Sequence, residues 1–169
     1  MKTSVTSYGH ASRAYSFYKH DTPYLIIGMR NSWSHEPTPD DATIDSAITD
    51  IIGYKKIDSK LMVELDPSSG TITYKDQKWS VVDPEQAISK KCNHIYITAT
   101  INYDEFSSVT SYRQIGIVTK LEPKPGKESS SLLMPTDVKN PGWLEILENR
   151  TPVYRSTDQM EKLAIILEF

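Results

Sequence analysis

The sequence predicts a mainly β (α+β) fold: an antiparallel β-sandwich with one well-capped helix and one or two short helices. Three observations favour this class. Ile, Thr and Val supply 40 of the 169 residues, and there are ten Tyr; such side chains fit a pleated, half-buried surface. Most apolar stretches are short runs bounded by turn residues, which is typical of strands. Helical spacing with clear end signals is confined to residues 38–52.

The chain is expected to begin with an N-terminal arm or short helix over residues 1–22, followed by a single domain over residues 23–169. Within the arm, residues 11–19 are expected to form a short helix with Ala14, Tyr15 and Tyr18 on one face. Residues 23–28, Pro-Tyr-Leu-Ile-Ile-Gly, predict a buried strand because the run is short, continuous and apolar. A loop with two prolines follows up to residue 39, since Pro cannot donate to a strand ladder.

The strongest helix signal lies over residues 38–52. Thr38 can cap the helix, Pro39 suits its first position, and the two following Asp favour the positive end of its dipole. Four isoleucines recur at helical spacing, at positions 44, 48, 51 and 52. Gly53 is a plausible stop, and the lysines at 55 and 56 follow near the negative end.

Short strands are expected in the middle of the chain, over residues 60–65, 71–74, 79–82, 94–102 and 111–121. The segment 94–102 shows the clearest alternation, with Ile95, Ile97 and Ile101 on one face. A helical turn or two is expected over residues 84–91, with Asp83 as its cap.

Residues 122–140 predict a loop of about 19 residues, which is uncommonly long for a compact domain. It contains three consecutive apolar residues, Leu132, Leu133 and Met134. Exposing them to solvent would be unfavourable, so we expect them to dock onto a partner chain or onto the flank of the domain itself. Docking onto a partner predicts fast amide exchange over residues 124–134 in the isolated protein.

Two strands are expected to close the chain, over residues 143–148 and 159–169. The last is apolar on both faces, with Leu163, Ile165, Leu167 and Phe169 on one side and Ala164 and Ile166 on the other. A strand of this kind is usually covered on both sides, and we therefore expect it to be central in the sheet system.

Charge and composition exclude several classes of function. The net charge is −3 and the pI about 5.8, so the basic surplus of a nucleic-acid binder is missing. The longest apolar runs have about five residues against the roughly 20 of a membrane helix, and the first residues do not resemble a signal peptide. The one cysteine, Cys92, cannot form an intrachain disulfide. A soluble protein made on the cytoplasmic side is expected.

No residue pattern argues for catalysis, a cofactor or a metal. His35 with Asp40 or Asp41 could form an acid–base or metal site, or a small hydrolase, but the spacing fits no ligand motif. Acidic residues at a helix start are the more common explanation. Cys92 and His94 would share a strand face, and a buried thiol beside a rim histidine explains them better. We expect no catalytic, cofactor-binding or metal-binding residues and no small-molecule substrate.

Three arginines stand out as candidate interface residues. Arg113, Arg150 and Arg155 each lie at or near a predicted strand end, beside an aromatic or acidic residue. Arg forms bidentate pairs with carboxylates and is enriched in interfaces. Salt bridges within the domain would explain the same pattern, and the sequence leaves both explanations open.

The order of several motifs resembles a known family. The chain has Ile26-Ile27-Gly28, then Trp33 with Pro37 and Pro39, then Lys55-Lys56-Ile57. Later motifs are Tyr74-Lys75 with Trp79, the segment Tyr-Arg-Gln-Ile-Gly at 112–116, and Asn-Arg-x-Pro-x-x-Arg beginning at Asn149 and running on to Glu161. Over about residues 23–169 this resembles the baseplate wedge family of contractile-tailed bacteriophages, typified by gene product eight of T-even phages.

The resemblance implies a structural β-sandwich protein of the virion tail baseplate, assembled in the host bacterial cytoplasm, that joins wedge subunits through protein–protein contacts. Its partners would be other baseplate or tail proteins, or a second copy of itself. The alternative is a carbohydrate-binding or receptor-binding module of a phage tail, since three Trp and ten Tyr could stack on sugars. The candidate interface residues are Trp33, Arg113, Leu132, Leu133, Met134, Arg150 and Arg155.

Overall fold

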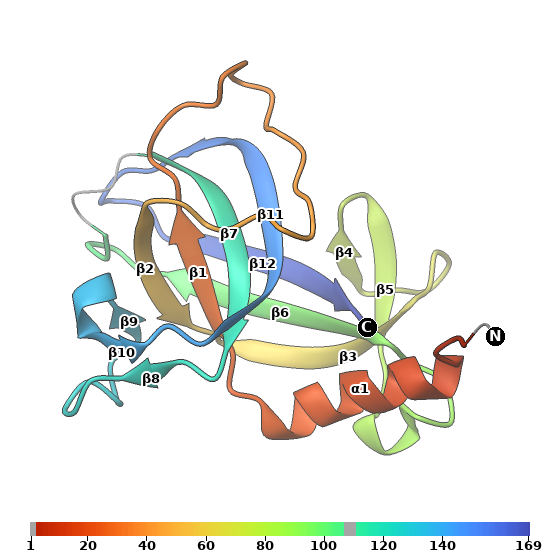
Figure 1. Cartoon of the computed structure of the whole chain (residues 1–169). Coiled ribbons are helices and arrows are strands. Elements are labelled where there is room, and N and C mark those ends of the chain that lie inside the picture. Colours follow the sequence, from red (N-terminus) through yellow and green to blue (C-terminus); the bar gives the residue numbers. More distant parts are fainter. Residues whose placement is uncertain (1–2, 107–110) are drawn as a thin grey trace. The chain divides into compact units, whose positions relative to one another are not determined.

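The computed structural model describes residues 3–106 and 111–169 and divides the chain into two compact units (Figure 1). Unit 1 contains residues 3–21, 58–98 and 163–169, and unit 2 contains residues 22–57, 99–106 and 111–162. Both are built mainly from antiparallel strands, so the predicted mainly β, sandwich-like class is confirmed. That residues 23–169 fold as one domain stays a prediction.

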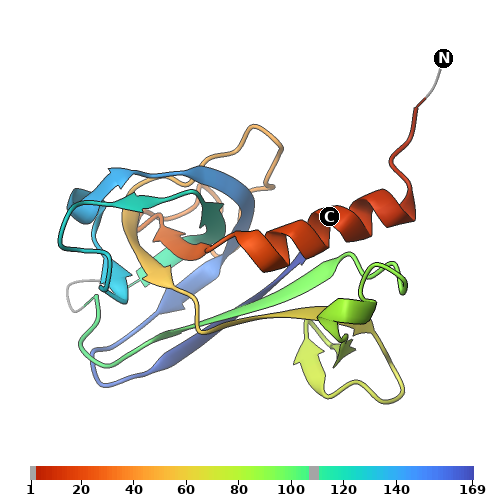
Figure 2. The ribbon, with the colours of Figure 1, turned by 90° about the horizontal axis from the view of Figure 1, so that it is seen from below.

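Unit 1 carries α1 (Ser7–His20), the one α-helix of the described residues. The Thr6 hydroxyl accepts a hydrogen bond from the Gly9 N–H at 3.2 Å, which caps the first turn. Ala11, Ala14 and Phe17 are buried on one face, and the helix packs beside β3 (Ser59–Leu65) (Figure 2). The predicted short helix at 11–19 is therefore confirmed, and it begins one turn earlier. Its buried face differs from the predicted one, because Phe17 is buried whereas Tyr15 and Tyr18 are only partly buried.

The strands of unit 1 lie in a five-stranded sheet of order β12-β6-β3-β5-β4. Its members are β12 (Glu161–Glu168), β6 (His94–Ile101), β3, β5 (Gln77–Val81) and β4 (Ile72–Tyr74). The 3-10 turn η1 (Pro84–Gln86) is capped by the Asp83 carboxylate, as expected. Leu163, Ile165 and Leu167 are buried on one face of β12, as their alternation predicts.

The expected central position of the last strand is wrong, because β12 is the terminal strand of its sheet. The other face of β12 explains the error. Ile166 is only partly buried there, and it lines a hollow of about 370 Å³ together with Trp79 and His94. A strand with apolar residues on both faces can therefore lie at the edge of a sheet, as β12 does.

Unit 2 contains a five-stranded sheet of order β11-β7-β1-β2-β9. Its members are β11 (Trp143–Tyr154), β7 (Ser111–Thr119), β1 (Tyr24–Gly28), β2 (Ile51–Lys56) and β9 (Leu132–Leu133). β1 is buried along its whole length between two antiparallel neighbours, with Leu25 opposite both Lys55 and Ile117. The continuous apolar run of β1 therefore correctly predicted a buried strand.

The predicted helix over residues 38–52 is wrong. Residues 29–50 form a long loop without helix or strand, and Ile51–Lys56 is β2. The isoleucines that suggested a helical face are split between these elements: Ile44 is fully exposed, whereas Ile52 is fully buried. Gly53 does not end a helix but lies within β2, where a Cβ would be 2.5 Å from the Phe106 ring. Pairing with β1 outweighed the local capping signals.

The expected structureless loop at 122–140 is also wrong. It contains β8 (Glu122–Pro123), β9, the 3-10 turn η2 (Pro135–Asp137) and β10 (Val138–Asn140). β10 pairs with β8, and β9 pairs with β2 through Leu132–Lys55 and Leu133–Tyr54. Pairs of two or three residues give too short a pattern to be detected in the sequence.

No helix in the described part of the chain has the length and apolar character needed to cross a membrane.

Candidate protein interaction surface

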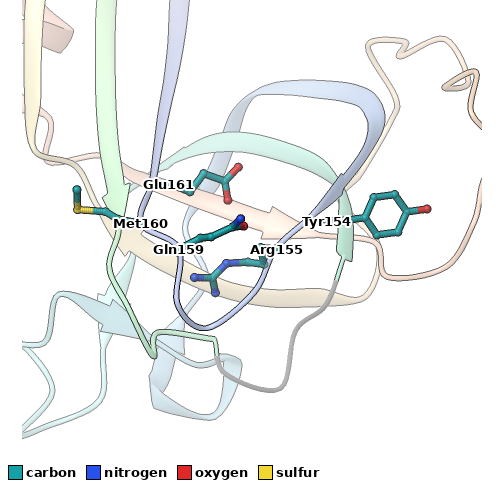
Figure 3. A pocket seen from close by; sticks show the side chains of 5 residues that line it. All are labelled: Tyr154, Arg155, Gln159, Met160 and Glu161. Atoms are coloured by element: carbon teal, nitrogen blue, oxygen red, sulfur yellow. The ribbon is translucent and has the colours of Figure 1, made fainter.

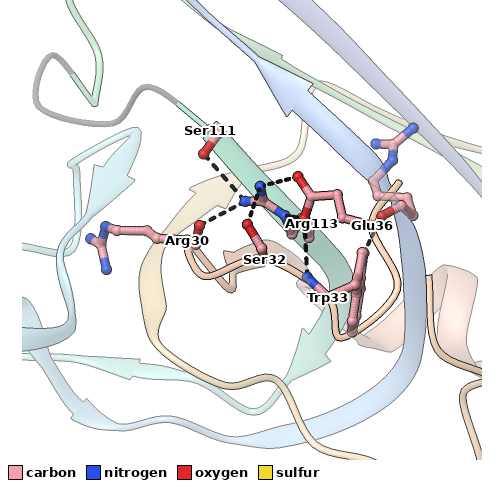
Figure 4. A network of polar contacts seen from close by, with 7 residues as sticks. Arg30, Ser32, Trp33, Glu36, Ser111 and Arg113 are labelled. Carbon is pink, nitrogen blue, oxygen red and sulfur yellow. Dashed lines mark hydrogen bonds and ion pairs between the residues drawn. The ribbon is translucent and has the colours of Figure 1, made fainter. Parts of the chain in front are cut away.

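A buried arginine holds the long loop 29–50 against the sheet of unit 2 (Figure 4). Arg113 on β7 is 3% exposed and forms a two-pronged pair with Glu36, from Nε to Oε2 at 2.8 Å and from Nη2 to Oε1 at 2.6 Å. Its Nη1 also donates to the Arg30 carbonyl at 2.6 Å. Such fork-like pairs fix geometry as well as adding energy, so this one residue holds the first part of the loop at β7.

The electrostatics of Glu36 reflect the same pair. The hydrogen bond from Arg113 lowers the pKa of the Glu36 carboxyl to about 2, with the Trp33 backbone N–H as a further donor and partial desolvation opposing the shift. The Trp33 indole N–H donates to the Arg150 carbonyl at 2.9 Å. The loop is thereby fastened to β7 through Arg113 and to β11 through Trp33.

A second polar centre joins three other segments of unit 2. Lys55 on β2 is 3% exposed, and its Nζ lies 2.7 Å and 2.8 Å from the two carboxylate oxygens of Glu105. Burial opposes ionisation of Glu105, but hydrogen bonds from Lys55 and from the Asn102 N–H outweigh it and lower the pKa of the carboxyl. The Ser131 hydroxyl donates to the same carboxylate at 3.2 Å. These contacts place the 102–106 turn and the segment before β9 together.

Within the apolar triplet of the 122–140 segment, Leu133 docks onto its own unit. Leu133 is fully buried in a cluster with Tyr24, Ile26 and Tyr54, whereas Met134 remains 38% exposed. Of the two docking modes predicted for this segment, the one onto the chain's own flank is the one observed.

The most exposed aromatic side chains among the described residues of unit 2 lie at the two ends of β11. Trp143, its first residue, is 69% exposed and Tyr154, its last, is 70% exposed. β11 is the terminal strand of its sheet, so within the described residues no strand pairs with its outer edge. Its register against β7 shifts between Leu144 and Ile146 and again between Asn149 and Val153. Such irregularities discourage uncontrolled edge pairing and leave the side chains as the contact elements.

Comparison with known proteins shows the family of the chain. A family model described as "Baseplate wedge 3 tail fiber network component" matches residues 2–169. The chain belongs to this family. It is also similar to "Virion protein 3" of Enterococcus phage phiEF24C, with 35% identity over 160 residues that cover 89% of this chain and 86% of that protein. The resemblance to baseplate wedge proteins is confirmed: this chain is a virion component of a phage baseplate, and other tail proteins are its partners.

The predicted interface residues of this baseplate wedge component do not form one exposed patch. Four of them are at most 8% exposed: Trp33, Arg113, Leu133 and Arg155. Arg155 donates from Nη1 to the carbonyls of Glu105 and Phe106, so it braces the 102–106 turn. Arg150 is partly exposed beside Glu148, with 3.9 Å between Nε and Oε1. That these residues contact other tail proteins stays a prediction, and Met134 and Arg150 are the more accessible of them.

Cys92 and His94 of this wedge component make contacts within unit 1. No group of three or more His, Cys, Asp or Glu side chains is placed to hold a metal ion within the described residues. The Cys92 thiol is buried and donates to the Val63 carbonyl at 3.2 Å, and burial raises its pKa. The His94 ring packs against Trp79 with centroids 5.0 Å apart.

Sequence reasoning missed the acidic partners in this wedge component. Glu36, Glu105 and Glu161 each hold a buried or half-buried group that lies 49 to 77 residues away along the chain. Sequence periodicity cannot detect pairs of residues that lie so far apart along the chain. Arg and Lys are rarely buried without a partner, and only this rule could have prompted a search for these acidic residues.

Proposed function

We propose that the protein joins wedge subunits to other tail proteins, and that the two ends of β11 are its main contact points. The observation that carries the proposal is the exposure of Trp143 and Tyr154, at 69% and 70%. Trp and Tyr are enriched among the few residues that carry most of the binding energy of interfaces. Membership of a baseplate and tail-fibre network family supports a function in assembly.

An apolar hollow near the start of β11 supports a contact at this end of the strand. It has a volume of about 170 Å³ and is lined mainly by aliphatic side chains, including Ile48, Ile51 and Leu144, together with Pro141 and Gly142. A large apolar side chain of a partner would fill a space of this size, and the residues that carry most binding energy cluster in well-packed, desolvated pockets of interfaces.

The function can be tested by assembly of the phage tail. Trp143→Ala and Tyr154→Ala should each reduce incorporation of the protein into baseplates by tenfold or more, while the thermal unfolding of the isolated protein stays close to that of the wild type. Tyr8→Ala is the matched control, because Tyr8 is a 54% exposed aromatic residue on unit 1. Wild-type incorporation of both β11 variants would refute the proposal.

A structural candidate for the carbohydrate-binding alternative is the hollow of about 370 Å³ in unit 1 that Tyr74, Trp79 and His94 help to line. Trp79 is only 6% exposed and packs on His94, so it offers little open ring face for a sugar to stack on. Trp33 is equally buried. The protein–protein proposal is therefore the better supported of the two, and we propose a role without catalysis.

A further inference from the structure

One edge of β12 has no strand beside it. β12 pairs with β6 on its inner side, and among residues 3–106 and 111–169 no strand pairs with its other side, which we call the open edge. Its eight residues contain neither Pro nor Gly. Edges of this kind accept further strands readily, and proteins usually protect them with proline, bulges or charges. β11 has irregularities of that sort, so β12 is the edge better suited to receive another strand.

Hydrogen bonds at the end of β12 indicate which backbone groups face the open edge. The Phe169 N–H donates to the carbonyl of Asn93 at 3.0 Å, and the Asn93 side-chain amide donates to the Phe169 carbonyl at 3.2 Å. Asn93 immediately precedes β6, and the backbone groups of successive strand residues point to opposite edges. The odd-numbered residues of β12 therefore face β6. The N–H and C=O groups at the open edge belong to Lys162, Ala164, Ile166 and Glu168.

The side chains of these four even-numbered residues lie on the more accessible face of β12. None of the four is buried, whereas the odd-numbered residues from 163 to 167 are buried on the opposite face. Figure 3 shows the same alternation where the strand begins, because Met160 and Glu161 point to opposite sides of the chain. Glu161 accepts a hydrogen bond from the Tyr112 hydroxyl at 2.5 Å, which anchors the start of the strand.

The sequence of β12 is close to symmetric about Ile165. Residues of matching or complementary type lie at equal distances on either side of it: Lys162 and Glu168, Leu163 and Leu167, and Ala164 and Ile166. If a second copy approaches the open edge in the antiparallel direction, with the two Ile165 residues opposite each other, each Lys162 lies opposite a Glu168. Directly opposite residues of an antiparallel pair share a face and interact. Such a pairing contains two ion pairs, one at each end.

Other alignments of two such strands lose this complementarity. A shift by two residues, the smallest that keeps the same backbone groups in use, places Lys162 opposite Ile166 in one direction and Glu168 opposite Ala164 in the other. A parallel alignment in register places like charges opposite each other, which is unfavourable. Glu168 is accessible for the contact, because its side chain is 71% exposed and its pair with His94 is long, at 3.8 Å. Charge therefore selects a second copy in one register.

We propose that the open edge of β12 binds β12 of a second copy of this chain, antiparallel and centred on Ile165. The unit 1 sheets of the two copies then continue into one sheet, and the same surface is used on both copies, as in a two-fold dimer. Strand addition of this kind gains affinity from main-chain hydrogen bonds. The inference goes beyond the proposed function, because it uses a strand other than β11 and needs no other tail protein.

Sedimentation of the isolated full-length protein tests the pairing. In low salt, at about 100 µM, where contacts of micromolar Kd are occupied, we expect twice the 19.2 kDa of one chain. Lys162→Glu and Glu168→Lys each place like charges opposite at both ends and should weaken the dimer about tenfold. The double exchange should restore it. Glu85→Lys, at an exposed residue of η1, is the matched control and should change nothing. A monomeric wild type, or no recovery in the double exchange, would overturn the proposal.

Disulfide trapping tests the register. Lys162→Cys and Glu168→Cys bring two cysteines opposite each other only in a mixed dimer. In a dimer of either variant alone the two cysteines lie six residues apart along the strands, about 20 Å, which a disulfide cannot span. The mixture should therefore cross-link under mild oxidation and neither variant alone should, while the buried Cys92 stays unreacted. Cross-linking of a single variant, or none in the mixture, would refute the register. Trapping that fails while assembly still depends on Trp143 would leave the proposed function intact.

Discussion

Leu133→Ala tests whether the 122–140 segment is held by the chain itself. Leu133 is fully buried among Tyr24, Ile26 and Tyr54, so truncation removes three buried carbons, worth about 2.4 kcal/mol at roughly 0.8 kcal/mol each. A residual cavity of roughly 50 Å³ would add about 1 kcal/mol. We therefore expect the free energy of unfolding to fall by about 3 kcal/mol in urea denaturation.

Hydrogen exchange supplies the second measurement. The Lys56 N–H donates to the Ser131 carbonyl at 2.9 Å, and the Lys124 N–H donates to the Asp137 carbonyl at 2.8 Å. Both amides should exchange slowly in the isolated wild-type protein and markedly faster in Leu133→Ala. Met134→Ala is the matched control, because its side chain is 38% exposed and should cost less than about 1 kcal/mol. Fast exchange in the wild type, or equal costs for the two variants, would refute docking onto the chain's own flank.

Three further predictions concern buried groups. Because the Glu36 carboxyl has a pKa of about 2, below the roughly 4.3 of an unfolded chain, its stabilising effect should be complete above about pH 4.3 and lost as the pH falls toward 2. The Trp33 indole N–H resonance should therefore stay unchanged down to about pH 3, and a midpoint near pH 4 would contradict the pair with Arg113. Ile165→Ala should lower the free energy of unfolding by about 2–5 kcal/mol, since Ile165 is 1% exposed; a loss below about 1 kcal/mol in urea denaturation would mean that this face of β12 is not core. The Cys92 thiol should react with iodoacetamide far more slowly in the folded protein than in urea, because it is buried and its pKa is raised.

Arg150 and Arg155 have similar sequence surroundings, but the structure gives them different environments. Arg155 braces the 102–106 turn through backbone carbonyls and is buried, so its removal is expected to affect folding before assembly. Arg150 is partly exposed and remains the better candidate for a contact whose loss weakens assembly alone.

The sequence by itself determined the class of the fold and those elements whose signal is local. Continuous apolar runs, β-branched composition and alternation placed strands correctly at β1, β6, β7 and β12. The core face of β12 followed in the same way, because burial of every second residue is encoded in the strand itself. Motif order along the chain was sufficient for the family.

Only the tertiary structure decided the conformation of residues 38–52 and 122–140 and the polar anchors. A Thr-Pro-Asp-Asp start favours a helix by roughly 1–2 kcal/mol in total, and burying Ile52 and Tyr54 in a strand against β1 offsets more than that. The pairs Arg113–Glu36 and Lys55–Glu105 span 77 and 50 residues. Their partners are chosen by which strands become neighbours in the sheet, and no local pattern in the chain carries that information.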